Sequence, residues 1–339
     1  MIKLGVLDQS PVRVGATYAD AINESVELAR ATEKLGYSRY WVAEHHAADG
    51  FAGSAPEILI GRIAGATDSI RVGSGGVMLS HYSPYKVAET FRVLEVLYPG
   101  RIDLGIGRAP GSDRHTAVAL AYGNQLGIEY FPNKVLDLRA FLSDQKPVTE
   151  ALHGIRATPE SESDPELWIL GSSAESARMA AQFGIRFSFA HFINPYAGGE
   201  VSRTYRTEFE PGDHLPAPRT SVGVFTICAD TEEEAIRLAK SRDLWRLRAD
   251  QGRLGQIPTV EEAESTQYTP AEQAQIEHNR IRYVVGNPDQ VKARLAEIAA
   301  EHEAEEVVLL TITPDYESRL RSYELVAKAF GVQGKENRI

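Results

Sequence analysis

The chain has 339 residues, of which 43% are hydrophobic and 24% are charged, and this composition is typical of a soluble globular protein. The formal net charge of −11 at pH 7 argues against nucleic acid or an anionic membrane surface as a partner. The single cysteine, Cys228, excludes an intramolecular disulfide and favours a reducing compartment. The sequence shows no signal-peptide pattern and no stretch of about 20 apolar residues, so we expect a cytoplasmic protein.

The first half of the chain alternates strand-like and helix-like patterns. Residues 102–106 alternate apolar side chains with polar or small ones, which is strand spacing. Pro84 opens a pattern with one apolar face, which predicts a helix that ends at Pro99 and Gly100. On these criteria we expect strands at residues 2–7, 40–43, 70–79 and 102–106, and helices at residues 17–35, 55–66 and 84–97.

The second half continues the alternation with longer connections. Residues 143–166 are polar and acidic and predict a long loop, and residues 248–283 predict an insertion with one helical piece. Thr231 and Asn287 have the positions of helix N-caps, each followed three residues later by Glu or Gln. We expect the remaining strands at residues 167–170, 186–190, 221–229 and 307–311, helical pieces within residues 116–141, and a last helix from Pro314.

Eight strand patterns, each followed by a helical pattern, predict a single-domain (β/α)8 barrel, the TIM barrel, over residues 1–333. The insertions fall in the C-terminal half, and residues 334–339 form a polar tail. A doubly wound open sheet is the alternative, but it would place a glycine fingerprint at the first strand-to-helix turn. That turn, residues 8–11, contains no glycine, so the α/β barrel is the favoured fold.

Barrel enzymes carry their catalytic groups at the carboxyl ends of the strands. At these ends the sequence has polar residues and glycines, and no lysine that could form a Schiff base. The residues expected there are Asp8, His45, His46, Gly75, Gly76, Arg108, Ser172, Ser173, Ser176 and His191. This set suits a phosphate with histidines nearby better than it suits a metal ion.

A pair of glycines and an arginine carry most of this interpretation. Gly75 and Gly76 interrupt a buried strand and leave bare backbone facing a neighbour, although a β-bulge would explain them equally well. Arg108 follows the next strand along the chain. Its forked guanidinium is suited to gripping a phosphate, although a surface ion pair is the alternative.

The turn after the fifth strand offers hydroxyl groups to an anion. Ser172 has the position of an N-cap, with Glu175 three residues later as the capping partner. Ser173 and Ser176 would then occupy the first and fourth helical positions and share one face near the positive end of the helix. Backbone N–H groups and hydroxyls at such a place form an anion site.

The two adjacent histidines are weaker candidates for a metal site. His45 and His46 follow each other along a strand, so their side chains are expected on opposite faces and not on one metal ion. One histidine that faces the barrel mouth could act as a base or a hydrogen-bond donor. A hydrogen-bonded structural histidine is the alternative.

Four segments resemble the bacterial-luciferase-like flavin monooxygenases, in the order of that family. They are YWVAEHH (40–46), IRVGSGGVML (70–79), PGRIDLGIGRAPGSD (99–113) and LGSSAESARMAAQFG (170–184). The resemblance implies a (β/α)8 barrel that binds reduced FMN supplied by a separate NAD(P)H:flavin reductase. In this family oxygen adds to the flavin to give a C4a-hydroperoxide, which oxidises a small organic substrate.

The resemblance also implies a role for individual residues. His45 matches the active-site histidine beside the flavin. Gly75 and Gly76 match a pair that is joined by a non-prolyl cis peptide under the isoalloxazine. The other expected cofactor-binding residues are Arg108, Ser173 and Ser176 at the phosphate, Ser172 at the ring system, and Gly107 and Ala174 beside them.

The sequence departs from the family, and several rival functions stay open at this point. Gly107 replaces a cysteine that luciferase places near the flavin, so we expect no light emission. The rival functions are hydride transfer with the deazaflavin F420, flavin binding without turnover, and a sugar-phosphate lyase or aldolase. The family pairs through the second and third helices, so we expect a homodimer. Gly61, Ala64 and Gly65 give the second helix a small-residue face, which internal packing would explain equally well.

Overall fold

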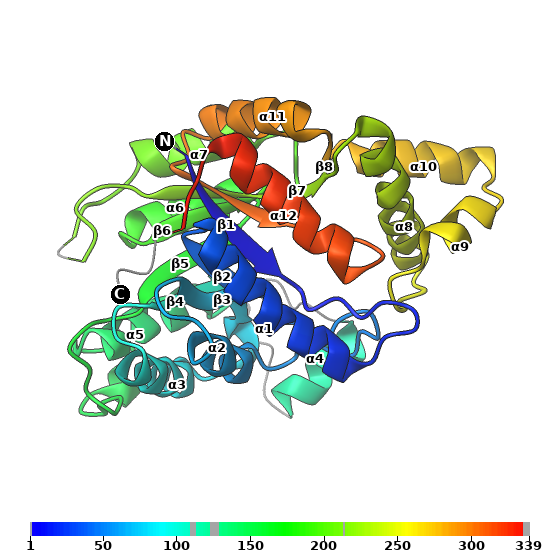
Figure 1. Ribbon diagram of the computed structural model, residues 1–339. Coiled ribbons are helices and arrows are strands. Elements are labelled where there is room, and N and C mark those ends of the chain that lie inside the picture. Colours follow the sequence, from blue (N-terminus) through cyan, green and yellow to red (C-terminus); the bar gives the residue numbers. More distant parts are fainter. Residues whose placement is uncertain (1, 109–112, 123–128, 213, 335–339) are drawn as a thin grey trace.

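The computed structural model describes residues 2–108, 113–122, 129–212 and 214–334, which form a barrel of parallel strands surrounded by helices (Figure 1). The described strands are β1 (Lys3–Asp8), β2 (Arg39–Val42), β3 (Arg71–Met78), β4 (Ile102–Gly107), β5 (Glu166–Gly171), β6 (Arg186–Ala190), β7 (Thr220–Cys228), β8 (Tyr283–Gly286) and β9 (Glu306–Leu310). Of the predicted polar tail, residues 335–339 lie outside the described residues.

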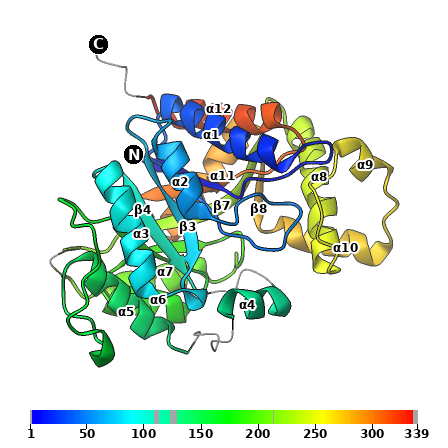
Figure 2. The same cartoon turned by 90° about the horizontal axis from the view of Figure 1, so that it is seen from below.

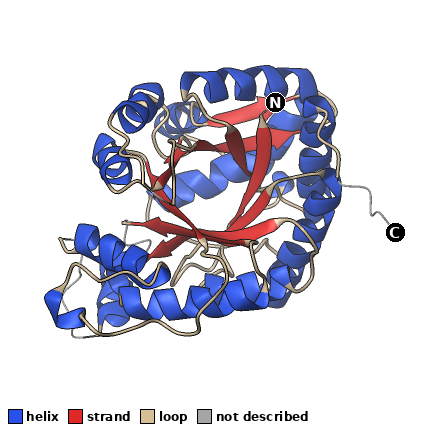
Figure 3. Cartoon of the chain, turned by 90° about the vertical axis from the view of Figure 1, so that its left-hand side faces the viewer, coloured by secondary structure: helices blue, strands red, loops and turns tan. Residues whose placement is uncertain are grey.

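The barrel closes in the described residues through the neighbours β1, β2, β3, β4, β5, β6, β7 and β9, with β9 returning to β1. Every pairing between these strands is parallel. Figure 3 shows the strands at the centre with helices around them, which is the arrangement that parallel strands joined by helices require. The predicted (β/α)8 fold is confirmed.

The helices follow the strands as the sequence patterns indicated. They are α1 (Tyr18–Leu35), α2 (Pro56–Ala64), α3 (Pro84–Leu97), α4 (Arg114–Ala121), α5 (Phe131–Leu142), α6 (Ala174–Gln182), α7 (Gly198–Thr207), α8 (Glu232–Asp250), α9 (Val260–Ser265), α10 (Pro270–Arg280), α11 (Pro288–Glu301) and α12 (Tyr316–Phe330). Among the described helices, none combines the length and the apolar character that a membrane span requires.

Several predicted helix ends are confirmed by hydrogen bonds. Thr17 caps α1 through a capping box with Asp20, and Gly36 ends this helix with a φ of 92°. Asn287 and Gln290 form the predicted capping box of α11. The last helix begins later than predicted, at Tyr316, because Asp315 is its N-cap and accepts from the Ser318 N–H. The side chains of short polar residues therefore set these boundaries.

The strand β8 is missing from the sequence-based assignment, which placed the insertion up to Tyr283. The first part of β7 pairs with β6 as far as Gly223, and residues from Phe225 onward pair with β8 instead. The upper half of β7 would otherwise present unpaired backbone groups on that side, and β8 satisfies them. A strand of four residues next to a capping box gives too short a pattern to recognise.

The insertion also holds two helices where the pattern predicted one. Helices α9 and α10 both contact α8, and the three together extend from one side of the barrel (Figures 1 and 2). This lobe follows β7, so it rises beside the carboxyl ends of the strands. The insertion therefore adds to the wall of the barrel mouth, where barrel enzymes bind their ligands.

The amino end of the barrel is closed by buried ion pairs. Arg39 bonds to Asp103 at 2.6 Å and to Glu306 at 2.8 Å, and Arg71 bonds to Asp103 at 2.7 Å. These residues stand at the starts of their strands, so this end is filled by paired charges. The opposite end is the one that remains available for a site.

Candidate active site

A cavity of about 630 Å³ opens at the carboxyl ends of the strands. It brings together eight of the predicted site residues: His45, Gly75, Gly76, Gly107, Arg108, Ser172, Ser173 and Ser176. Ala174, the remaining predicted cofactor residue, does not line the cavity but is the first residue of α6. Segments far apart in the sequence thus converge on one space.

The glycine pair in β3 lies at the floor of this cavity. The peptide bond between Gly75 and Gly76 is cis, as the family resemblance implied. A Cβ at Gly75 would lie 2.6 Å from Leu7 Cδ1, and a Cβ at Gly76 would lie 2.6 Å from the Gly105 carbonyl oxygen. Gly76 therefore requires glycine, because its neighbour is backbone, whereas a Cβ at Gly75 would require the Leu7 side chain to move. The register of the pairing with β4 also shifts between Gly75 and Val77, as a β-bulge would produce.

Arg108 follows β4 and points to the start of α6. Its Nη1 lies 2.5 Å from Oε1 of Glu175, and this contact lowers the pKa of the glutamate. The pair is largely exposed, with 36% of the Arg108 side chain and 71% of the Glu175 side chain accessible. An exposed pair of this kind is worth about 0–1 kcal/mol, so a phosphate dianion can compete with Glu175 for the guanidinium.

The capping residue of α6 differs from the prediction. Ser173, and not Ser172, is the N-cap: its backbone is extended, with φ −131° and ψ 155°, and its hydroxyl accepts from the Ser176 N–H at 3.3 Å. Strand β5 runs to Gly171 and the helix begins only at Ala174, so Ser172 precedes the cap. The Ser173 and Ser176 hydroxyls still lie together, 3.3 Å apart, near the positive end of the helix.

His45 is the histidine that lines the cavity. Its Nε2 lies 3.5 Å from the Gln9 side-chain nitrogen, its ring packs 4.6 Å from the Phe51 ring, and its Nδ1 is buried with no hydrogen-bond partner among the described residues. Burial lowers the pKa of His45 to about 4, with help from the nearby His46 and Arg242. The imidazole is therefore neutral at pH 7 and offers one donor and one acceptor nitrogen.

His46 does not line the cavity, but both histidines lie beyond β2, which ends at Val42, and not on a strand as predicted. Its Nε2 lies 2.7 Å from the buried carboxylate of Glu44. Glu44 also accepts from the Met78 N–H and from the Tyr82 hydroxyl. These contacts join the end of β2 to the segment after the glycine pair, so Glu44 and His46 hold the cavity wall in place.

Asp8 and His191 were expected at the site and lie outside the cavity. The Asp8 carboxylate pairs with Arg319 at 2.5 Å and accepts from the Tyr40 hydroxyl at 2.6 Å. Burial alone would raise the pKa of Asp8, but Arg319 and these hydrogen bonds bring it below its usual value. The His191 ring packs 6.3 Å from the His302 ring. The ion pair and hydrogen bond give Asp8 a structural role that a position at a strand end cannot reveal.

The cavity wall also contains residues that sequence reasoning missed. Leu7, Trp41, Leu170 and Phe192 form apolar surfaces in it, and Gln9 supplies a polar group whose Oε1 is buried without a partner among the described residues. Gln9 could have been found, because it directly follows the first strand. The apolar residues could not, because their pattern is also that of an ordinary core.

The residues present fit FMN. The glycine pair, which has no side chains, and the apolar walls suit a flat aromatic system, and Arg108 with two hydroxyls and a helix start suits a phosphate. A metal ion has no comparable place, since no three His, Cys, Asp or Glu side chains gather within the described ranges. The buried Cys228 lies outside this cavity, and burial raises the pKa of its thiol to about 12.

Comparison with known proteins gives relatives over nearly the whole chain. The family model described as luciferase-like monooxygenase matches residues 2–304. The uncharacterized protein YceB of Bacillus subtilis is 46% identical over 97% of this chain and 100% of its own length. An N-acetyl-S-alkylcysteine monooxygenase of the same organism is 37% identical over 97% of this chain and 98% of its own. The crystal structure of apo-MsnO8, 42% identical, has a TM-score of 0.91 and covers 98% of this chain and 99% of that one.

Two more distant structures share the fold. The oxygenating constituent of 3,6-diketocamphane monooxygenase from Pseudomonas putida, in complex with FMN, has a TM-score of 0.71 at 17% identity and covers 97% of both chains. An F420-dependent secondary alcohol dehydrogenase has a TM-score of 0.68 at 14% identity and covers 97% of this chain and 98% of its own. The match to the family model and the relatives above 30% identity establish that this chain belongs to the luciferase-like monooxygenase family.

Proposed function

We propose that the protein is an FMN-dependent monooxygenase that uses reduced FMN and dioxygen to oxidise a small organic substrate. One observation carries the proposal: Arg108, Ser173 and Ser176 share a single cavity with the Gly75–Gly76 pair. A cation with two hydroxyls suits a phosphate, and a glycine floor suits a flat ring. The family and its monooxygenase members support the reaction class.

Each part of FMN has residues that would hold it. The phosphate would be bound by Arg108, the hydroxyls of Ser173 and Ser176, and the free N–H groups at the start of α6, with Ala174 as the first of these. The isoalloxazine would lie on Gly75 and Gly76. Gly107 and Ser172 also line the cavity and would contact the cofactor.

The chemistry of the bound cofactor is oxygen transfer. When bound, reduced flavin would supply two electrons to dioxygen, so that one oxygen atom would reach the substrate and the other would leave as water. His45 stays neutral and would hydrogen-bond at the edge of the ring, together with Gln9. Trp41, Leu170 and Phe192 keep water away from the reacting atoms.

The test compares FMN with riboflavin, which lacks the phosphate. Arg108→Ala should weaken FMN binding by about 10- to 100-fold, because a charge-assisted contact is worth about 1.5–3 kcal/mol. Riboflavin binding should stay the same. Quenching of flavin fluorescence in a titration measures both affinities, and calorimetry without oxygen measures the affinity for reduced FMN.

Glu175→Ala is the matched control. It breaks the same ion pair but keeps the guanidinium, so FMN should bind as tightly as before or more tightly. Equal losses of FMN and riboflavin in Arg108→Ala would contradict the phosphate contact, and a wild-type protein that binds neither form of FMN would overturn the function. A parallel titration with F420 addresses hydride transfer, which tighter binding of F420 than of FMN would favour.

Two partners belong to the proposal. Reduced FMN would come from a separate NAD(P)H:flavin reductase, because the sequence has no dinucleotide fingerprint. NADH alone should then fail to bleach FMN in the presence of the protein. A second copy of the chain is the other partner, because α2 and α3 expose Ile58 (74%) and Leu97 (59%). Light scattering would then give about twice the 37.3 kDa mass of the chain.

The small-residue face of α2 is not the surface proposed for this dimer. Ala64 is buried, and a Cβ at Gly61 would lie 3.5 Å from the Leu94 side chain of α3. The Tyr98 hydroxyl donates to the Gly61 carbonyl at 3.0 Å. This face therefore packs inside one copy of the chain.

A further inference from the structure

Asn194 lies on the loop after β6 and connects this loop to the turn that precedes α6. Its side-chain Nδ2 donates to the Ser172 carbonyl at 3.2 Å, and its Oδ1 accepts from the Tyr196 N–H at 3.2 Å. The two contacts need a donor on one side of the amide and an acceptor on the other, so they fix its orientation. Asn194 does not line the cavity, although Ser172 does. Any effect of Asn194 on the cavity therefore passes through Ser172.

The loop that carries Asn194 is anchored to the ends of β6 and β7. The Ile193 and Asn194 N–H groups both donate to the Ala190 carbonyl, at 3.0 Å and 3.2 Å. The Phe192 N–H donates to the Gly223 carbonyl of β7 at 3.3 Å. These bonds hold the backbone of Asn194 in place, and its side chain then holds the turn after β5.

The contact with Asn194 sets the direction of the peptide between Ser172 and Ser173. This peptide bond is trans, since the cis bonds of the described residues lie elsewhere. In a planar trans peptide the carbonyl and the N–H point in opposite directions. Because the Ser172 carbonyl points to Asn194, the Ser173 N–H points away from Asn194.

The Ser173 N–H is the first of a run of free donors at the start of α6. It donates to no described residue. Ala174 and Glu175 follow as the first two residues of α6, and N–H groups at these positions have no acceptor within a helix. The Ser173 and Ser176 hydroxyls and Arg108 line the same cavity. Consecutive backbone donors beside a cation and two hydroxyls suit the several oxygens of a phosphate.

We propose that Asn194 is a positioning residue for the phosphate of FMN. By holding the Ser172 carbonyl, it directs the Ser173 N–H toward the phosphate that Arg108 and the two serine hydroxyls would bind. The inference rests on the function proposed above and adds a residue that does not itself touch the cofactor. A donor that is already oriented binds an anion without the entropy cost of ordering a flexible turn.

The experiment compares FMN with riboflavin in the wild-type protein and in Asn194→Ser, by fluorescence titration. Serine can still accept from the Tyr196 N–H, but its side chain is too short to reach the Ser172 carbonyl. FMN affinity should fall by about 3- to 10-fold, because one oriented hydrogen bond to a charged group is weakened. Riboflavin, which has no phosphate, should bind as tightly as before.

Tyr196→Ala is the matched control from the same loop. The Tyr196 side chain is 66% exposed, and its removal keeps the backbone N–H that orients Asn194. This variant should keep the wild-type ratio of FMN affinity to riboflavin affinity. Circular dichroism establishes that each variant is folded.

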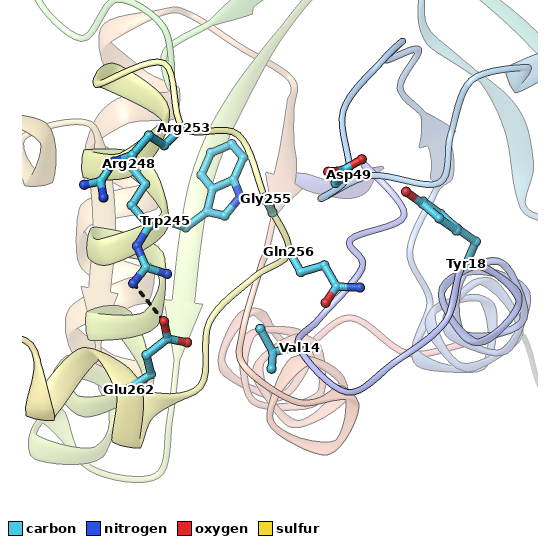
Figure 4. Close-up of a pocket in the computed structure, with 9 residues that line it drawn as sticks. All are labelled: Val14, Tyr18, Asp49, Trp245, Arg248, Arg253, Gly255, Gln256 and Glu262. Carbon is cyan, nitrogen blue, oxygen red and sulfur yellow. Dashed lines mark hydrogen bonds and ion pairs between the residues drawn. The ribbon is translucent and has the colours of Figure 1, made fainter.

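A second control concerns another pocket that contains arginines. Figure 4 shows this pocket, with Arg248 and Arg253 on one side and Asp49 on the other. Arg248 is already paired with Glu262 at 2.8 Å. Arg253→Met should therefore leave both flavin affinities unchanged. A loss of FMN affinity alone in this variant would place the phosphate in that pocket and overturn the inference.

The wild-type protein provides a test that needs no substitution at Asn194. In protein labelled with 15N, the Ser173 amide proton should shift downfield when FMN is added and should shift less with riboflavin, because only FMN brings a phosphate acceptor. This measurement decides the question if Asn194→Ser does not fold. Equal shifts with the two flavins would contradict the proposed contact.

Two further results would overturn the inference. One is an Asn194→Ser protein that keeps the wild-type affinity for FMN. The other is an equal loss of FMN and riboflavin affinity in this variant, which would show that Asn194 only supports the fold. A wild-type protein that binds neither flavin, or binds FMN no more tightly than riboflavin, would instead overturn the cofactor assignment of the proposed function. The same titrations therefore distinguish the two failures.

Discussion

Two buried arginines at opposite ends of the barrel have similar neighbours and different partners. Arg39, at the amino end, lies 5.2 Å and 4.7 Å from the Trp41 and Trp168 ring centres and pairs with Asp103 and Glu306. Arg242, beside the carboxyl end, has two rings at similar distances and no carboxylate partner in the described chain. The carboxylates raise the pKa of Arg39 against the effect of burial, whereas burial lowers the pKa of Arg242.

The comparison shows that the charged groups that stabilise the fold and the polar groups that can bind a ligand lie at opposite ends of the same barrel. At the amino end the charged groups satisfy one another, so removal of any one leaves its partners buried and unpaired. At the carboxyl end Gln9 and His45 line the cavity and each has a buried polar atom without a partner among the described residues, so a ligand can supply one. The following predictions test this division, from the largest expected effect to the smallest.

Asp103→Ala should have the largest effect on stability. It leaves Arg39, Arg71 and the Trp41 N–H without a shared acceptor, and breaking such a buried network costs about 3–5 kcal/mol. Urea unfolding measures this loss. Glu175→Ala at the carboxyl end should cost less than about 1 kcal/mol, because its ion pair is exposed. Similar losses of unfolding free energy in the two variants would contradict the proposed difference between the two ends of the barrel.

His45 should give an acid-dependent loss of intermediate size. Above its ordinary pKa of 6.5 the folded and unfolded states are both neutral, so the full stability is present. As the pH falls from 6.5 toward the folded value of about 4, only the unfolded state takes up the proton. The unfolding free energy should therefore fall by about 1.4 kcal/mol per pH unit from this residue.

His45→Gln isolates that contribution. The buried His191 and His302, whose pKa values are also lowered to about 4, remain in both proteins and contribute equally. The difference in unfolding free energy between wild type and variant should then change between about pH 7 and about pH 5. A difference that does not depend on pH would show that His45 has the same pKa in the folded and the unfolded protein.

Gly107→Ala should have the smallest effect. A Cβ at this position would meet nothing within 4 Å among the described residues, so the unfolding free energy should change by less than about 0.5 kcal/mol. Gly76→Ala is the contrasting variant, since its Cβ would lie 2.6 Å from the Gly105 carbonyl oxygen. Overpacking of this kind costs about 1–3 kcal/mol or more. Equal stability of both variants in urea would mean that the cavity floor is less rigid than its contacts indicate.

Local patterns in the sequence predicted the fold well because each helix and strand carries its own signals. Thr17, Gly36 and Asn287 mark helix ends through contacts within a few residues, and such contacts can be read from spacing. Strand β8 escaped because its four residues form a strand only against the upper half of β7. Pairing across 58 positions, from Phe225 to Tyr283, is not encoded in any short pattern.

The site was predictable only in part, for the same physical reason. Position at a strand end predicted that Arg108, Ser173 and Ser176 lie together, and they line one cavity, while the family resemblance added the cis bond at Gly75. The unpaired state of Arg242 could not be inferred. The segment RDLWRLRAD contains three arginines and two aspartates, and only the folded lobe, through Arg280 of α10, decides which of them are paired.

The exposed contact between Arg108 and Glu175 bears on how long the enzyme keeps its flavin. The phosphate of FMN would take the place of the exposed Glu175 carboxylate on Arg108 at the rim of the cavity. FMN would therefore bind and leave without any opening of the barrel core. Under the proposed function, such an anchor suits a cofactor that is exchanged at every turnover. Reduced FMN would then behave as a diffusible co-substrate, and its concentration in the cell would set the rate of the reaction.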